Sequence, residues 1–216
     1  MARTLRACPP SIVRRRLCTP EETVALIDFR TPAAGFDQPL ELWLACHDRV
    51  RRMTGLLERL REHMANMGAD DAARVTATSI RRYFDEAAPR HHEDEEVDLF
   101  PLLRRLLPVK APQRLAEVEQ ALARLEADHA SLGRVWQQLR PVLEAIERGE
   151  SVQLDAAAVL TFADGYRGHC EVEDTIVADA LRLCLGDTEL DALGQAMAER
   201  RGVDWAHLHS SRGAGK

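Results

Sequence analysis

The chain has few aromatic residues, few cysteines and no long apolar run. Aromatic residues make up 5% of its 216 residues, whereas apolar residues together make up 45%, which is enough for one sizeable core. No run of about eighteen apolar residues occurs, so we expect no helix that spans a membrane. The five cysteines follow no regular spacing, and such an odd set is typical of a cytoplasmic protein rather than of a disulfide framework.

The sequence also lacks the marks of export and of nucleic-acid binding. Residues 1–20 carry several arginines but no long apolar segment and no clear cleavage site, so no secretory signal is apparent. A net charge of -6 argues against nucleic acid as the main partner. We expect residues 1–36 to be a short basic arm, ended by a helix-breaking stretch at 31–35.

Helix-forming residues with a helical period fill the rest of the chain. Leucine, alanine, arginine and glutamate are frequent, and apolar residues recur every three or four positions. This pattern predicts long helices over about 37–67, 71–107, 115–148 and 154–185, followed by a short helix over 188–200. Short connections between four long helices predict an all-α, up-down-up-down four-helix bundle over 37–186. Residues 187–216 then hold the short helix and a polar tail.

Polar residues and prolines mark where these helices begin and bend. Asp37 is the predicted N-cap of the first helix, and Asp70 is the predicted N-cap of the second. Pro89 and Pro101 lie inside the second helix and should kink or locally unwind its backbone. His63 lies off the apolar stripe of the first helix, which indicates a surface residue.

The segment HHEDEEVDLFP, at 91–101, concentrates histidines and acids just before apolar residues. On a helix, residues four positions apart share a face. His91 therefore points the same way as Glu95, and His92 points the same way as Glu96. One imidazole and one carboxylate on a single face form half of a transition-metal site.

The same spacing recurs downstream, where His169 is followed by Glu173. The surroundings recur as well, because Phe84 precedes His91 by seven residues and Phe162 precedes His169 by seven. Internal repetition of this kind predicts two halves related by an approximate two-fold axis.

Two single histidines, His47 and His129, lie on the apolar stripes of the first and third helices. In the predicted bundle they can converge with the two His-x-x-x-Glu pairs at one level of the core. Burying these groups with nothing between them costs several kcal/mol per unpaired group, and a metal ion offsets that cost. The predicted metal ligands are His47, His91, Glu95, His129, His169 and Glu173.

The residue types leave the identity of the metal open. Imidazole and carboxylate ligands without a thiolate suit iron, manganese or zinc. A lone zinc ion needs about four ligands, whereas six ligands that include two carboxylates suit two metal ions bridged by those carboxylates. A purely structural zinc bundle would leave both carboxylates unused. A ferritin-like redox enzyme uses Glu-x-x-His on paired helices, and the one such spacing here, Glu126 to His129, has no partner.

Either pair on the second helix could bind a metal, so the inward frame has to be chosen. The apolar stripe through Phe84 and the parallel with the second unit both place His91 and Glu95 inward. A residue one position along is turned by about 100°, too far for both pairs to ligate fully. We therefore expect His92 and Glu96 at the rim of the site.

With these motifs the chain resembles the hemerythrin-like, or HHE cation-binding, family over residues 37 to about 186. The resemblance rests on His47, the 91–101 segment with its Leu-Phe-Pro ending, His129, and His169 with Glu173. It implies a four-helix bundle around a non-haem di-iron centre, whose two iron ions share an oxo or hydroxo bridge. Members of the family bind dioxygen reversibly, sense oxygen or iron, or are linked to nitric-oxide stress and iron–sulfur cluster repair.

The resemblance is closest to the four-histidine branch of that family. Hemerythrin itself has a second histidine one turn after the third-helix ligand, and this chain has Gly133 there. Glu126, one turn before His129, is an alternative ligand for the gap. The resemblance implies a cytoplasmic di-iron protein that binds or senses dioxygen or nitric oxide, has no catalytic residue and can form a homodimer. The alternative is a di-iron redox protein in iron–sulfur cluster repair or the nitrosative stress response.

Overall fold

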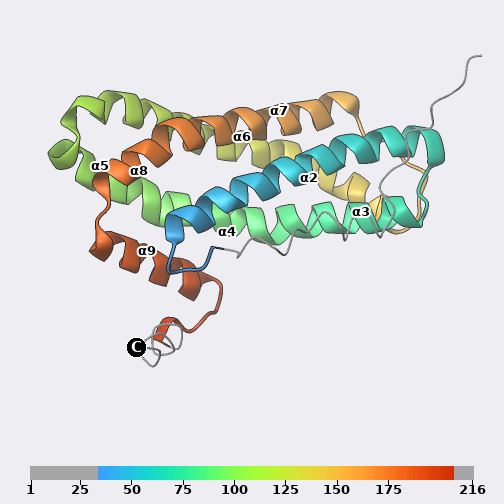
Figure 1. The fold of residues 1–216 in the computed structure, drawn as a ribbon. Helices are drawn as coiled ribbons and strands as arrows, with labels where there is room; N and C mark the ends of the chain where they lie inside the picture. The colour runs from blue at the N-terminus through green and yellow to red at the C-terminus, as the bar shows by residue number, and fades with distance from the viewer. Residues whose placement is uncertain (1–33, 207–216) are drawn as a thin grey trace, which may run out of the picture.

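The structure, a computed structural model, describes residues 34–206, and this part of the chain is all-α, which confirms the predicted fold class (Figure 1). Successive long helical runs are antiparallel, with α2 (Pro39–Met67) as the first and α6 (Leu115–Glu147) as the third. The second run comprises α3 (Asp71–Arg82), η1 (Tyr83–Ala87), α4 (Ala88–Glu93), η2 (Asp94–Leu99) and α5 (Phe100–Lys110). The fourth comprises α7 (Ala156–Val172), η4 (Glu173–Val177) and α8 (Ala178–Cys184), and a short 3-10 turn, η3 (Pro112–Arg114), precedes α6.

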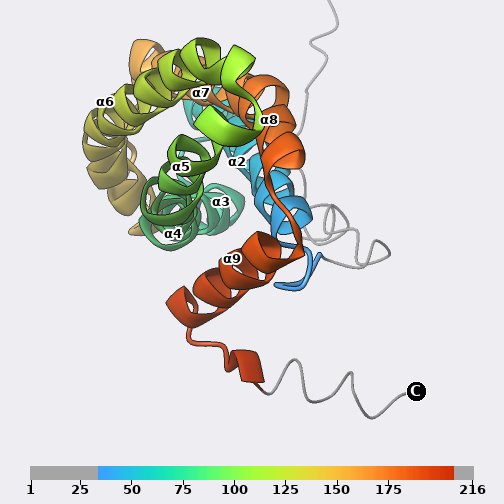
Figure 2. The ribbon, with the colours of Figure 1, turned by 90° about the vertical axis from the view of Figure 1, so that its left-hand side faces the viewer.

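A further helix, α9 (Asp187–Arg200), lies beside the end of the bundle where α2 begins (Figures 1 and 2). Between residues 34 and 206, none of the helices combines the length and the apolar character that a membrane span requires. Most of the predicted N-terminal arm and the end of the polar tail lie outside the described residues.

Helix starts follow the predicted capping residues in one case and depart from them in another. Asp70 caps α3, because its carboxylate accepts a hydrogen bond from the Ala73 amide at 2.8 Å. The predicted cap of α2 is wrong, since Gln38 rather than Asp37 is its N-cap, and Pro39 occupies the first helical position. Proline there already has a helical φ angle and no amide hydrogen that needs a partner.

The structure corrects two other predictions, the end of the second helical run and the exposure of His63. The second run continues to Lys110 instead of ending at 107, with Pro108 inside its last turns. The Lys110 ammonium donates to the Cys184 carbonyl at 2.6 Å, which ties this end to α8. His63 is not a surface residue, because its side chain is only 8% exposed and its Nε2 lies 2.9 Å from a carboxylate oxygen of Asp70.

Three short stretches of the bundle, η1, η2 and η4, are π-helical. Two of them end just before Pro89 and Pro101, where the sequence predicts local unwinding, because proline cannot donate to the carbonyl four residues back. The third has no proline near it, and nothing in the sequence predicts it. Glu95 lies in η2 and Glu173 lies in η4, and π-helical turns are frequent at functional sites.

The core consists of two apolar clusters separated by a polar layer. One includes Phe84, Trp136, Phe162 and Tyr166, and the other includes Trp43, Leu99, Phe100 and Val177. On α6, His129 lies between Leu125 of one cluster and Leu132 of the other. Each helical run passes from one cluster to the other at the level of its candidate ligands, so the bundle places them in one buried layer.

Candidate metal centre

Five histidines and two glutamates from all four helical runs converge in this layer. They form two groups of potential ligands, and the ligand atoms of each group lie within 4.8 Å of one another. The His47 group consists of His47, His91, Glu95 and Glu173, and the His129 group consists of His92, Glu95, His129 and His169. The structure therefore brings together all six residues that the sequence predicts, and adds His92 to them.

Each carboxylate has one oxygen close to an imidazole of each group. The oxygen-to-Nε2 distances are 3.0 Å for Glu95–His91, 3.2 Å for Glu95–His129, 3.3 Å for Glu173–His47 and 3.3 Å for Glu173–His169. Adjacent ligands of a six-coordinate ion with bonds of about 2.1 Å are about 3.0 Å apart. The spacings therefore match neighbouring positions around metal ions.

Several buried atoms at the centre have no hydrogen-bond partner. They are Nε2 of His47, Nε2 of His92, Oε2 of Glu95 and both carboxylate oxygens of Glu173. Leaving one buried polar group unsatisfied costs about 1–3 kcal/mol, so five such atoms in one layer are a large penalty. A cation at the centre would satisfy them, and imidazole with carboxylate is a donor set that iron, manganese and zinc accept. The residues present thus fit a metal centre.

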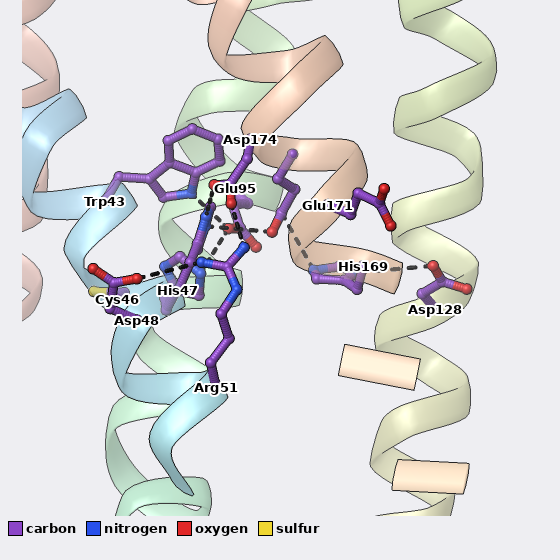
Figure 3. Close-up of polar contacts among 12 residues, drawn as sticks. Trp43, Cys46, His47, Asp48, Arg51, Glu95, Asp128, His169, Glu171 and Asp174 are labelled. Atoms are coloured by element: carbon purple, nitrogen blue, oxygen red, sulfur yellow. Dashed lines mark hydrogen bonds and ion pairs between the residues drawn. The ribbon is translucent and has the colours of Figure 1, made fainter. Parts of the chain in front are cut away.

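Carboxylates outside the centre orient two of the imidazoles. His47 Nδ1 lies 2.6 Å from Asp174, which Arg51 holds in turn (Figure 3). His129 Nδ1 lies 2.6 Å from Glu96. A carboxylate at Nδ1 keeps the proton on that nitrogen, so the lone pair of Nε2 is free for a metal. Glu96 thus lies outside the ligand groups, as the sequence predicts, and orients a ligand.

Trp43 and Asp128 complete the surroundings (Figure 3). The Trp43 indole donates to Oε1 of Glu95 at 2.6 Å, and its ring packs edge-on against His47 with centroids 4.6 Å apart. Asp128 lies 3.8 Å from Nδ1 of His169, an ion-pair distance. These contacts leave few alternative positions for the ligands that they touch.

Burial and neighbouring charges shift the pKa values of the candidate ligands. Burial lowers the pKa of His91 to about 3 and the pKa of His169 to about 4, although the charge of Glu95 acts to raise both. Burial and the neighbouring Glu95 hold the pKa of Glu173 well above its usual range. Burial also acts to raise the pKa of Glu95, but His91 and His129 outweigh it and hold that pKa well below its usual range. Two ionised carboxylates here would repel each other, and a cation between them would offset that repulsion.

His91 and Glu95 point inward, as expected from the sequence, but His92 also lies in the buried layer rather than at its rim. Its Nε2 is buried in the His129 group, and its ring stacks on that of His129 with centroids 3.9 Å apart. The expectation of a rim position assumed one inward direction. On an α-helix, Glu95 lies about 40° from His91 on one side and about 60° from His92 on the other. The two adjacent histidines therefore lie on either side of Glu95. The pattern His-His-x-x-Glu is the feature of the sequence that indicates an inward position for both histidines.

The same residue brings a fifth imidazole into the layer, one more than the expected four-histidine set. Gly133 is exposed on the outside of α6, so a histidine missing there leaves no gap at the centre. The alternative ligand Glu126 instead forms an ion pair with Arg104, whose Nη1 lies 2.7 Å from its carboxylate. The fifth imidazole comes from the second helical run rather than from the third.

Fold and site together define a helical-bundle metal protein. Residues 38–181 match the family of the hemerythrin HHE cation binding domain, and the chain belongs to that family. A protein of Haemophilus influenzae, described only as uncharacterized, is 31% identical over 170 residues, which are 79% of this chain and 94% of the relative. The family supports cation binding at the His and Glu groups, as the sequence predicts.

Proposed function

We propose that the centre holds two iron ions and binds or senses dioxygen or nitric oxide. The observation that carries the proposal is the placement of Glu95 and Glu173, each with one oxygen toward either group of ligands. A carboxylate placed between two imidazole groups is suited to bridge two ions. One zinc ion would need only about four of the seven side chains.

The two groups differ in their number of imidazoles. The His129 group holds three imidazoles, whereas the His47 group holds two. Because a six-coordinate ion offers six positions, the group with fewer imidazoles leaves more room for an external ligand. Two iron ions would supply redox-active positions for dioxygen or nitric oxide, and we propose that the ligand binds on the side of His47 and His91.

The apolar walls of the centre support reversible binding over irreversible oxidation. Phe84, Phe162 and Tyr166 are all buried on one side, and the Tyr166 ring lies 6.2 Å from the His169 ring, between centroids. Trp43 and Phe100 close the other side and are 0% exposed. Excluding water limits proton leakage and side reactions at a reactive centre.

Metal content tests the first half of the proposal. Protein purified from iron-replete cells is expected to contain about two irons per chain, because seven ligands with two spanning carboxylates exceed the needs of one ion. Elemental analysis against protein concentration measures this ratio. One zinc per chain without iron would contradict the two-iron centre.

Reaction with dioxygen tests the second half. The reduced, oxygen-free iron protein is expected to develop a stable near-ultraviolet and visible absorption band on mixing with dioxygen, and to lose it when dioxygen is removed. Stopped-flow and equilibrium spectra measure both steps. Rapid, irreversible oxidation would contradict a carrier or sensor and would favour the alternative role in iron–sulfur cluster repair or nitrosative stress.

A further inference from the structure

The C-terminal helix α9 packs against two elements that carry parts of the metal centre. Its neighbours are α2, which carries Trp43 and His47, and η2, which carries Glu95 (Figure 2). The match to the hemerythrin family ends at residue 181, before α9 begins at Asp187. This helix therefore lies outside the residues that match the family, and it packs directly against them.

Two arginines at the end of α9 hold the π-helical segment η2. Arg201 donates to both carboxylate oxygens of Asp94, at 3.0 and 2.6 Å, and Arg200 donates to Asp94 and, at 2.6 Å, to Asp98. Asp94 is 0% exposed. We call these four residues the arginine latch. A buried carboxylate with both oxygens held by arginine is costly to separate from its partners.

The latch acts on the residue next to the shared ligand. Asp94 and Glu95 are neighbours in η2, with Asp94 turned to α9 and Glu95 turned to the imidazoles. A π-helical turn is rare and less favourable than an α-helical one, so contacts outside the turn must stabilise it. Any rotation of this turn that moves Glu95 also moves Asp94 against the arginines.

A second, independent contact, at Gly194, holds α9 against the segment before α2. A Cβ atom added to Gly194 would lie 2.1 Å from the Phe36 carbonyl oxygen and 3.0 Å from the Trp205 ring. Glycine at this position therefore permits the close approach of α9 to the segment that leads into α2. An alanine there favours the helix itself but blocks its docking.

We propose that Arg200 and Arg201 are positioning residues for Glu95, and that docking of α9 and metal binding stabilise each other. The inference needs a metal at the proposed centre but not its reaction with dioxygen. Because such coupling is reciprocal, a metal should tighten α9, and loosening α9 should weaken the metal. The helix would then report the state of the centre at the protein surface.

The first test measures what the metal does to the helix. Hydrogen exchange of the full chain is followed by mass spectrometry under anaerobic conditions, without metal and with Co²⁺. Amides of α9 are expected to exchange about tenfold more slowly in the Co²⁺-loaded protein. Equal exchange rates of α9 in the two states would overturn the inference.

The second test measures what the helix does to the metal. Arg201→Ala and Gly194→Ala are each expected to raise the Kd for Co²⁺ about tenfold and to shift the visible Co²⁺ bands, which report ligand geometry. Arg201→Lys should recover part of the loss, because lysine keeps the charge but not the two-pronged contact. Gly133→Ala is the matched control, since its Cβ meets nothing within 4 Å.

The outcomes separate this inference from the proposed function. Unchanged Kd and unchanged bands in both Arg201→Ala and Gly194→Ala would overturn the coupling while leaving the metal centre in place. A wild-type chain that binds no Co²⁺ would overturn the metal centre and the coupling together. Circular dichroism of each variant shows whether the bundle is folded. If only Arg201→Ala weakened Co²⁺ binding and Gly194→Ala did not, docking of α9 would not be the cause.

Discussion

His92→Ala is expected to reduce the bound metal from about two ions per chain to about one, because it removes one of three imidazoles from the His129 group. His91→Ala should cause a similar loss from the His47 group, and the double variant should bind little metal. Elemental analysis after dialysis against a weak chelator measures all three. The expectation of two equal losses follows from the position of Glu95 between the two histidines.

His63→Ala provides the matched control for these variants. His63 lies on α2 with its side chain nearly buried, and it contacts Asp70 rather than either ligand group. It should keep the full metal content. If His91→Ala lost the metal while His92→Ala kept all of it, His92 would not be a ligand, and His91 and Glu95 alone would bind metal from this helix.

Helical periodicity was sufficient to predict the fold and most of the site. The four runs follow from apolar residues at spacings of three and four, and His47 and His129 stand out because they occupy positions on those stripes. The apolar stripe predicts a single inward direction and therefore leaves His92 out, whereas this helix faces two ligand groups. The apolar stripe of one helix does not show how many ligand groups that helix faces.

The contacts that orient the ligands could not be predicted from the sequence. Asp174 and Glu96 are ordinary acids on polar faces until the packing of helices distant in sequence places them at His47 and His129. The contact of Arg201 with Asp94 likewise joins residues 107 positions apart. Periodicity defines which face of a helix is buried, but it does not define which side chains of two helices meet.

Removing the metal is expected to lower the melting temperature of the wild-type protein by about 10 °C. A ligand that binds only the folded state at about 1,000 times its Kd stabilises by about 4 kcal/mol, and each kcal/mol is worth about 2–4 °C for a chain of this size. The physical reason lies in the unpartnered atoms of His47, His92, Glu95 and Glu173. Calorimetry with and without a chelator measures the shift.

Glu173→Gln separates this effect from ordinary destabilisation. Glu173 is 0% exposed, and burial and Glu95 disfavour its charged form, so in the metal-free protein a neutral amide of the same shape should leave the melting temperature unchanged or raise it. The same variant removes the charge that spans the two ligand groups, so the stabilisation by metal should fall to about a third of the wild-type shift or less. A variant that melts lower without metal yet keeps the full shift would mean that Glu173 supports the bundle rather than the metal. A variant that melts no lower without metal and loses most of the shift would mean that burying Glu173 destabilises the fold and serves to bind the cation.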